Sequence, residues 1–505
     1  MLLKDLLKGV KIIKSTGNLE TDIKGIGINS KKIGNGFLFC AIPGFKKDGH
    51  DFAGEAILNG ASALLVQKGV KIENPRDVAV IISEDTRKEL AVLSANFYKN
   101  PSQKLTLCGI TGTNGKTTTV FLTDSILRAS GKKTSFITTI YAEMDSEPMH
   151  FDRTTPESPE LNDFFYRSVA RGVNAACMEV SSHSIDLHRV SHLNFDYFAF
   201  TNLTQDHLDY HETMERYFEV KSRLFLPGFR KIFGGKGSVL NIDDPYGKTL
   251  LERTDLDVMT CSIKQESANI KAANAVSSID GIEMDLVLSK IPESINNRIK
   301  GVKKIRIKSA LCGDFNICNI MTAAGLGIFC GADPDEIAAG VRALEGVPGR
   351  FEKISLGGRY AIIDYAHTPD GLYNVLKTAR SLLKPGAKLI CVFGCGGDRD
   401  SGKRKIMGAV AARLADFSII TSDNPRTEDP GKIIEMITEG FTDNNCRSYE
   451  IEADRKKAID AALSGTGEND IVMIAGKGHE DYQEFSGKRI HFSDREVVLE
   501  WKSRP

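Results

Sequence analysis

The chain contains 505 residues, enough for about three domains of ordinary size, and 41% of them are apolar. Lys plus Arg and Asp plus Glu both number 66, so the net charge is zero, whereas a nucleic-acid-binding protein needs an excess of basic residues. No apolar run approaches the roughly 18 residues that span a bilayer, and the spacing in residues 1–10 predicts an amphipathic helix rather than a signal peptide. We therefore expect a monomeric cytoplasmic protein that binds small molecules and neither nucleic acid nor membrane.

The predicted elements divide the chain into three domains, over residues 1–102, 103–345 and 346–505. The first mixes short strands and helices, whereas the other two alternate strands with helices, which is typical of parallel sheets built from βαβ units. The central domain is predicted to have strands over 104–110, 173–180 and 195–203 and a helix over 117–130. The last domain is predicted to have strands over 360–364, 388–393 and 418–421, a helix ending at 380, and helices over 405–415 and 432–441. The predicted fold class is α/β, with a small N-terminal domain, a central P-loop-like parallel-sheet domain and a C-terminal Rossmann-like domain.

A glycine-rich turn links the strand over 104–110 to the helix over 117–130. Glycine lets backbone N–H groups approach phosphate oxygens, and a helix N-terminus favours negative charge. Lys116 is then expected at the β- and γ-phosphates of ATP, and Thr117 at Mg²⁺. Ile110 replaces the first glycine of the strict P-loop pattern, so the loop is a shorter variant. The predicted phosphate-binding residues are Gly112, Thr113, Asn114, Gly115, Lys116, Thr117 and Thr118.

Three polar side chains further along the chain are candidates for the same site. Glu179 lies at the end of the strand over 173–180, where a carboxylate is a natural Mg²⁺ ligand; the alternative is a capping or surface glutamate. The stretch 202–211 contains His207, and a histidine there either binds metal or caps a helix. Lys221 lies on a helix with an apolar face, and its residue type alone also fits a solvated lysine. Because ligands of open parallel sheets bind at the carboxyl ends of strands, we expect the site at that edge.

The motifs of this chain, in their order and spacing, resemble those of the Mur ligase family of ATP-dependent amide-forming enzymes, over essentially the whole sequence. They are Gly27–Lys32, Pro43–Phe52, Thr111–Thr118, Glu179–His183, Asp206–Asp209, Asn316–Asn319, Gly349–Glu352, Asp364–His367, Gly394–Arg399, Asp423–Arg426 and Gly476–Glu480. The resemblance implies a uridine-nucleotide-binding first domain, a central domain that binds ATP, and a third domain that receives an amino acid. It also implies Mg²⁺ as cofactor and ATP as co-substrate.

The resemblance assigns roles only to the positions that match. It implies catalytic roles for Lys116, Glu179, His207 and Lys221, and metal binding by Thr117, Glu179, His207 and Lys221. Lys221 is implied to react with CO₂, which turns a neutral amine into a carbamate with oxygen ligands for a second Mg²⁺. Further ATP contacts are implied for Asn316, Arg350 and Asp364. Contacts to the UDP-sugar-peptide are implied for Ser30, Lys46, Lys47, Asp48, Thr154, Thr155, Ser181 and Arg189. Contacts to the incoming amino acid are implied for Arg399, Asp423, Asn424, Pro425, Arg426, Gly476 and Glu480.

The stretch Asp423–Arg426 bears on which amino acid is used. An arginine fork can bind a carboxylate at two points, and meso-diaminopimelate has a distal carboxylate that lysine lacks. The resemblance therefore implies a ligase that adds meso-diaminopimelate to UDP-N-acetylmuramoyl-L-alanyl-D-glutamate through an acyl phosphate, in peptidoglycan precursor synthesis. The alternative for Arg426 is a turn residue that pairs with Glu428 or Asp429.

Two positions depart from the family pattern. Leu187 stands where glutamine is frequent, and Arg153 where asparagine is frequent before Thr154. Both belong to the region that is implied to hold the sugar-peptide substrate, so they bear on the identity of the acceptor and not on the ATP chemistry. Three alternatives stay open: a paralogue that adds L-lysine or another amino acid, a folylpolyglutamate-type ligase, and a catalytically silent protein that binds nucleotide-sugars.

Overall fold

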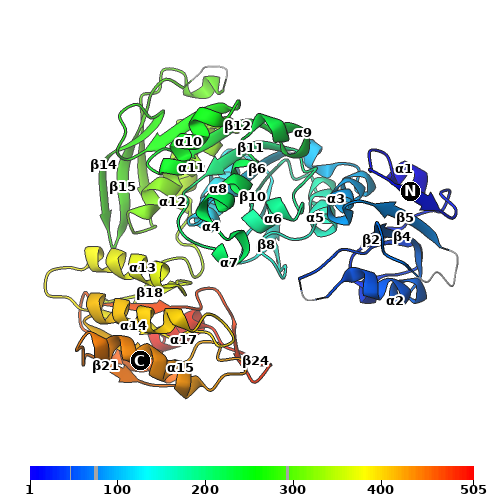
Figure 1. Cartoon of the computed structure of the whole chain (residues 1–505). Helices are drawn as coiled ribbons and strands as arrows, with labels where there is room; N and C mark the ends of the chain where they lie inside the picture. Colours follow the sequence, from blue (N-terminus) through cyan, green and yellow to red (C-terminus); the bar gives the residue numbers. More distant parts are fainter. Residues whose placement is uncertain (46, 73–77, 292–294, 505) are drawn as a thin grey trace. The chain divides into compact units, whose positions relative to one another are not determined.

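A computed structural model describes residues 1–45, 47–72, 78–291 and 295–504 (Figure 1). The chain divides into two compact units. The first contains Met1–Lys271, Val287–Ile305 and Cys318–Gly340, and the second contains Ala272–Leu286, Arg306–Ile317 and Val341–Pro505. Strands alternate with helices and most paired strands are parallel, which confirms the predicted α/β class. None of the described helices is long and apolar enough to cross a membrane.

The N-terminal part of the first unit is built on a small sheet in the order β1-β5-β4-β3-β2. Its strands are β1 (Lys14–Thr16), β2 (Gly25–Gly27), β3 (Phe37–Cys40), β4 (Ala61–Gln67) and β5 (Ala79–Ser83), and its helices are α1 (Leu3–Leu6), α2 (Ala53–Leu58) and α3 (Thr86–Phe97). Only β1 pairs antiparallel, with β5. The helix predicted over residues 1–10 is wrong in length: α1 ends at Leu6, and Gly9 has a left-handed φ of 78° that a continuing helix does not allow.

The central sheet of the first unit is mostly parallel. It contains β6 (Thr106–Thr111), β7 (Thr134–Ile137), β8 (Ala142–Met144), β9 (Glu147–Met149), β10 (Ala175–Glu179), β11 (Phe195–Phe200), β12 (Gly234–Asn241) and β13 (Asp257–Ser262), in the order β13-β12-β11-β6-β10-β7-β8-β9. The strands β14 (Ile270–Ser278), β15 (Gly281–Leu288) and β16 (Lys304–Ser309) continue the sheet beyond β13. The register places Glu179 opposite Ile110 and Phe200 opposite Thr111, so the ends of three neighbouring strands meet at one edge.

Nine helices of the described residues accompany the central sheet; most lie between its strands in the chain, whereas the last two follow β16. They are α4 (Lys116–Ala129), α5 (Ser158–Ala170), α6 (Ser182–Asp186), α7 (Leu208–His211), α8 (Met214–Ser222), α9 (Arg230–Phe233), α10 (Pro245–Arg253), α11 (Phe315–Phe329) and α12 (Pro334–Ala343). The predicted strand over 195–203 is too long, because β11 ends at Phe200 and the chain then turns toward the glycine-rich loop. There the backbone N–H of Thr201 donates to the carbonyl of Thr111 over 3.0 Å, and Thr201 Oγ1 donates to the carbonyl of Asn114 over 2.7 Å.

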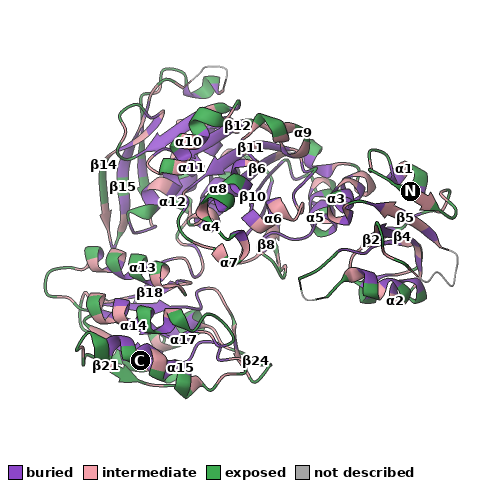
Figure 2. Ribbon diagram, in the orientation of Figure 1, coloured by how far each residue is buried: buried purple, intermediate pink, exposed green. Residues whose placement is uncertain are grey.

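The C-terminal part of the chain, in the second unit, has a sheet in the order β17-β18-β22-β19-β20-β21. Its strands are β17 (Glu352–Ser355), β18 (Tyr360–Asp364), β19 (Leu389–Phe393), β20 (Phe417–Ile420), β21 (Tyr449–Ile451) and β22 (Ile471–Ala475), with a separate hairpin of β23 (Tyr482–Phe485) and β24 (Lys488–His491). The helices are α13 (Pro369–Leu382), α14 (Gly402–Leu414), α15 (Pro430–Asp443), α16 (Arg455–Ser464) and α17 (Asp494–Lys502). Every residue of β19 and β22 is buried, as expected of parallel strands covered on both faces. Figure 2 colours the described residues by their burial.

Candidate active site

The glycine-rich loop joins β6 to α4 and contains two glycines with positive φ. Gly112 has a φ of 145° and Gly115 a φ of 84°, and a Cβ at either position would collide with Thr201 Oγ1 or Asn319 Oδ1. Glycine is therefore required at both positions. Lys116, the first residue of α4, donates from Nζ to the carbonyls of Gly112 over 3.2 Å and Thr113 over 2.7 Å. The ammonium group is thus folded over the loop, where the phosphates of ATP are predicted to bind.

Glu179 lies at the end of β10, next to this loop, and is only 1% exposed. Its Oε1 accepts hydrogen bonds from Thr117 Oγ1 over 2.7 Å and from the Thr139 backbone N–H over 2.8 Å. Thr139 Oγ1 donates to Oε2 over 3.1 Å. The alternative of a surface glutamate is therefore wrong. The Thr117 hydroxyl and the Glu179 carboxylate supply two hard oxygen donors side by side, which is the donor chemistry that Mg²⁺ prefers.

Lys221, on α8, is 1% exposed, so the alternative of a solvated lysine is also wrong. Its Nζ donates to the carbonyl of Gly112 over 2.9 Å and to Thr111 Oγ1 over 3.3 Å, and it lies 4.9 Å from the centre of the Tyr217 ring. Burial, reinforced by the charge of Lys116, holds the pKa of Lys221 well below its ordinary value. A lowered pKa makes the neutral amine, the form that can combine with CO₂, easier to reach.

His207 precedes α7 and has a left-handed backbone with a φ of 54°. Its Nε2 lies 3.4 Å from Asp206 Oδ2, and its ring centre is 5.0 Å from that of His183 and 6.0 Å from that of Tyr217. The structure thus brings His207 into the aromatic surroundings of Lys221. Within the described part of the chain, no three or more His, Cys, Asp or Glu side chains are placed to hold a metal ion. A Mg²⁺ site here would draw its remaining ligands from water and phosphate, as Mg²⁺ commonly does.

Four residues predicted to hold the sugar-peptide substrate lie beside Glu179. Thr155 Oγ1 donates to the backbone carbonyl of Glu179 over 3.0 Å and lies 3.3 Å from Ser181 Oγ. Thr154 Oγ1 lies 3.2 Å from Thr139 Oγ1, and Arg189 donates from NH1 to the carbonyl of Thr155 over 3.2 Å. The sequence offered no role for Thr139, whose hydroxyl and amide both bind Glu179.

Arg189 has a second buried partner that sequence reasoning missed. Glu157, which is 3% exposed and precedes α5, places Oε1 3.0 Å from Arg189 Nε. The two departures from the family pattern lie nearby in the chain: Leu187 is half-buried at the end of α6, and Arg153 is exposed.

The residues predicted to contact the uridine nucleotide belong to the N-terminal sheet region. Ser30 is 6% exposed and donates from Oγ to Glu55 Oε2 over 2.5 Å. Asp48 accepts from the backbone N–H and from Nδ1 of His50, over 3.0 and 2.6 Å, so it fixes the start of the short helical turn that follows. Lys47 is exposed, with Nζ 5.8 Å from the centre of the Phe52 ring. Lys46 lies outside the described residues.

Two of the predicted ATP contacts, Arg350 and Asp364, belong to the predicted third domain, and Asp364 is the last residue of β18; the other, Asn316, lies on α11. Asp364 Oδ2 accepts from the backbone N–H of Phe351 over 2.7 Å, and Oδ1 accepts from Ala366 N–H over 2.8 Å. The Arg350 guanidinium stacks on the Tyr365 ring at 4.8 Å. Asn316 is 3% exposed near the start of α11 and donates from Nδ2 to the carbonyl of Cys312 over 2.9 Å. Asp364 thus fixes the loop that carries Arg350.

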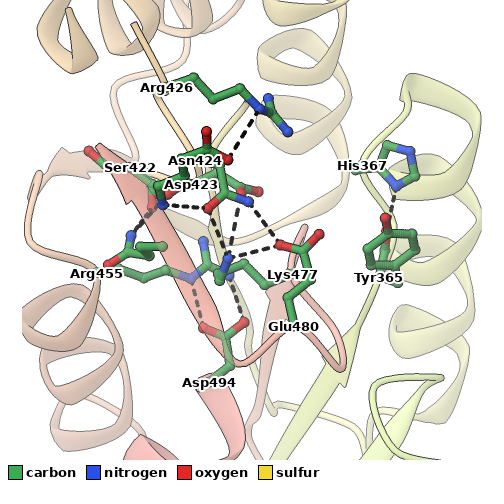
Figure 3. A network of polar contacts seen from close by, with 12 residues as sticks. Tyr365, His367, Ser422, Asp423, Asn424, Arg426, Arg455, Lys477, Glu480 and Asp494 are labelled. Atoms are coloured by element: carbon green, nitrogen blue, oxygen red, sulfur yellow. Dashed lines mark hydrogen bonds and ion pairs between the residues drawn. The ribbon is translucent and has the colours of Figure 1, made fainter. Parts of the chain in front are cut away.

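The predicted amino-acid pocket lies where β20 and β22 end (Figure 3). Asp423 and Asn424 are buried, and Asn424 Nδ2 donates to Glu480 Oε2 over 2.9 Å. Gly476 has a φ of 113°, and a Cβ there would lie 2.6 Å from Asp423 Oδ2, so only glycine allows this close approach. Pro425 is buried next to Asn424. Asn424 and Glu480, which the sequence placed in two separate motifs, are thus part of one polar network.

Arg426 projects from the same loop with a left-handed φ of 52°. Its NH1 donates to the carbonyl of Gly397 over 2.6 Å, and its Nε lies 3.9 Å from Glu484 Oε2. Glu428 pairs instead with Arg404 over 2.8 Å, and Asp429 caps α15, so the alternative pairing of Arg426 with either one is wrong.

Two further residues of this region are Arg399, whose contact with the amino acid stays a prediction, and Lys477, to which the sequence assigns no role. Arg399 is exposed, and the polar contacts between described residues do not include it in the network of Asn424 and Glu480. Lys477 belongs to the motif Gly476–Glu480, which assigns it no role, and it is 0% exposed. The sequence feature that could have indicated a buried lysine is its position directly after the apolar run Ile471–Ala475.

The chain was compared with known families and proteins. The Mur ligase family catalytic domain matches residues 22–100, the Mur ligase middle domain residues 110–327, and the Mur ligase glutamate ligase domain residues 349–478. UDP-N-acetylmuramoyl-L-alanyl-D-glutamate–2,6-diaminopimelate ligase of Clostridium tetani is 42% identical over 504 residues, which cover 99% of both chains. The ligase of the same name from Syntrophomonas wolfei is 40% identical over 501 residues, again covering 99% of both. A solved structure of a ligase of this name has 29% identity and a TM-score of 0.69 and covers 99% of this chain and 98% of that one. The resemblance of the motifs is thereby confirmed, and the chain belongs to the Mur ligase family.

Proposed function

We propose that this protein is the ATP-dependent ligase that joins meso-diaminopimelate to the D-glutamyl carboxylate of UDP-N-acetylmuramoyl-L-alanyl-D-glutamate. The observation that carries the proposal is the position of Glu179 between two sets of residues. Its carboxylate accepts from Thr117 of the phosphate loop, and its backbone carbonyl accepts from Thr155 on the predicted acceptor side. A phosphoryl donor and a carboxylate acceptor would therefore meet at one point. Relatives of this name at 40–42% identity over the full length support the choice of substrates.

The proposed reaction needs positioning and charge neutralisation rather than a side-chain nucleophile. The acceptor carboxylate oxygen attacks the γ-phosphorus, ADP leaves, and an acyl phosphate forms. The amine of the amino acid then attacks the acyl carbon, and phosphate leaves as the tetrahedral intermediate collapses. Lys116 neutralises charge on the transferred phosphoryl group. Thr117 and Glu179 would hold one Mg²⁺, and carbamylated Lys221 with His207 a second; bound Mg²⁺ supplies neutralising charge on the phosphates.

Phosphate release tests the proposal against the silent alternative. We expect release from ATP to require both UDP-N-acetylmuramoyl-L-alanyl-D-glutamate and the amino acid. A catalytically silent protein that binds nucleotide-sugars would release none. A folylpolyglutamate-type ligase would need a folate acceptor in place of the UDP-sugar.

Cytoplasmic location, the monomeric state and the predicted domain boundaries stay predictions.

Arg426 is expected to set the choice of amino acid. Its guanidinium, held above Gly397, would bind the distal carboxylate of diaminopimelate in a charge-assisted contact of about 1.5–3 kcal/mol, or about ten- to a hundredfold in efficiency. Arg426→Ala should therefore lower kcat/KM strongly for diaminopimelate and hardly at all for L-lysine. The measurement is the ratio of the two kcat/KM values in wild type and variant.

Arg489→Ala is the matched control for Arg426→Ala, because Arg489 also lies beside Glu484, at 3.7 Å, but is 65% exposed. The control should leave the ratio unchanged. If Arg426→Ala also leaves it unchanged, Arg426 is a structural residue of the loop and the choice of diaminopimelate loses its physical basis.

A further inference from the structure

Lys477 lies at the centre of the polar network in the predicted amino-acid pocket (Figure 3). Its side chain is 0% exposed, and its Nζ lies 3.0 Å from Glu480 Oε2, 3.4 Å from Asn424 Oδ1 and 3.9 Å from Asp423 Oδ1. The face of the Tyr482 ring lies 5.3 Å from the same nitrogen. One buried ammonium group therefore meets three of the residues that are predicted to receive the amino acid, although they come from separate motifs.

Lys477 also helps to orient the carboxylate of Glu480. Glu480 Oε2 accepts from both Lys477 Nζ and Asn424 Nδ2, over 3.0 and 2.9 Å. Asn424 Oδ1 in turn accepts from the backbone N–H of Glu484 over 3.0 Å, which fixes the orientation of its amide. Among the described residues, the hydrogen bonds to the Glu480 carboxylate end on Oε2.

A second buried ion pair anchors the strand that precedes Lys477. Arg455 and Asp494 are both 0% exposed in their side chains, with Nε–Oδ1 and NH2–Oδ2 distances of 2.7 and 2.8 Å. Arg455 NH2 also donates to the carbonyl of Ala475, the last residue of β22, over 3.0 Å. The end of β22, from which Gly476 and Lys477 follow, is thereby held in place.

The charged side chains around Lys477 add up to one net negative charge. A buried charge is tolerated only when it is paired, and Arg455 and Asp494 neutralise each other. Arg426 and Glu484, 3.9 Å apart, also offset each other, and Lys477 offsets one of the two carboxylates of Asp423 and Glu480, which leaves one negative charge. This net negative charge is complementary to the positive charge of an ammonium group. Without Lys477, two carboxylates would repel each other in a buried pocket, and Glu480 would lose one of the two bonds that orient it.

We propose that Lys477 is a positioning residue for the amino-acid pocket: it orients Glu480 and adjusts the pocket to a single negative charge, so that Glu480 can bind an ammonium group of the incoming amino acid. This inference rests on the proposed ligase function and deepens it. Lys477 acts through Glu480 and does not itself touch the substrate.

The test is steady-state kinetics of Lys477→Met on the full-length enzyme. We expect KM for the amino acid to rise at least about tenfold, because a charge-assisted contact is weakened, while KM for ATP and for the UDP-sugar dipeptide stay within about twofold. Lys456→Met is the matched control: Lys456 lies on α16 of the same domain but forms an exposed pair with Glu500, at 2.7 Å. It should change none of the three KM values.

A double-mutant cycle distinguishes positioning from mere support of the fold. In Lys477→Met/Glu480→Gln, KM for the amino acid should lie within about twofold of that of Glu480→Gln alone, because the lysine acts through that carboxylate. Independent, multiplicative effects would overturn the proposal, and so would an equal rise of all three KM values. Lys477→Gln, which keeps a donor toward Glu480, should show a smaller selective rise; if neither variant folds, Lys477 is structural and the proposal is wrong.

The comparison uses whichever of diaminopimelate, L-lysine and L-ornithine the wild type ligates best. A preference for lysine or ornithine would overturn the proposed substrate, and the Lys477 comparison would still be decisive. Absence of ligation with all three would overturn the proposed function and this inference together.

Discussion

Replacing Lys116 by alanine should lower the ligase rate by at least about 100-fold, because a preorganised positive charge on the transferred phosphoryl group is lost. Lys116 Nζ lies over the carbonyls of Gly112 and Thr113, within the loop where the phosphates are predicted to bind. The measurement is release of phosphate and ADP with both acceptor and amino acid at saturation.

Binding of the uridine nucleotide should survive the Lys116→Ala change. Ser30 and Asp48, its predicted contacts, form their hydrogen bonds with Glu55 and His50 in the N-terminal sheet region and not with the phosphate loop. Calorimetric binding of the UDP-sugar dipeptide should therefore match wild type. Lys133→Ala, which removes an exposed lysine that pairs with Asp145, serves as the control and should keep full activity. Near-normal turnover of Lys116→Ala would remove the loop from the mechanism.

Replacing Lys221 by alanine should leave the enzyme nearly inactive, and added short carboxylates such as acetate or formate should restore part of the rate. The physical reason is that a carbamate would present oxygen atoms beside the phosphate loop, where the buried Nζ of Lys221 now contacts Gly112 O. A small carboxylate can fill the space that the side chain vacates and supply the same kind of ligand. The measurement is the initial rate as a function of carboxylate concentration and of Mg²⁺.

Two controls separate the carbamate from a structural effect at Lys221. Lys231→Ala, an exposed lysine of α9, should be fully active and insensitive to acetate. Mass spectrometry of the wild type kept under CO₂ should show the carbamate on Lys221 and not on Lys231. Full activity of Lys221→Ala without added carboxylate would contradict the assignment.

The parts of the site that could be predicted from the sequence are those that local pattern determines. An apolar run followed by glycines and Lys116-Thr117 is sufficient to predict the strand, the loop and the helix, and the structure has β6, the loop and α4 in those places. The proximity of Glu179 follows from a general property of parallel sheets, since the carboxyl ends of strands share an edge. In the structure, Glu179 lies opposite Ile110, next to the start of the glycine-rich loop, as this property predicts.

The rest depends on contacts between residues far apart in the chain, which no local pattern contains. Thr139 binds Glu179, which lies 40 positions further along the chain, and Glu157 pairs with Arg189, which lies 32 positions further along. Whether Lys221 is solvated or buried depends on packing, so the residue type alone does not predict its burial. Likewise, the partner of Arg426 is set by the hairpin of β23 and β24, and this brings Glu484 closer than the neighbours Glu428 and Asp429 that the sequence suggested.

The proposed substrate pair is tested most directly by a competition measured on the product. The enzyme is given ATP, Mg²⁺, UDP-N-acetylmuramoyl-L-alanyl-D-glutamate and equal concentrations of meso-diaminopimelate and L-lysine, and the product is identified by mass. We predict that the product carries diaminopimelate in large excess over lysine and that its formation matches phosphate release one to one. A product that carries mainly lysine would contradict the proposed substrate, and the absence of any amide product would contradict the proposed ligase itself.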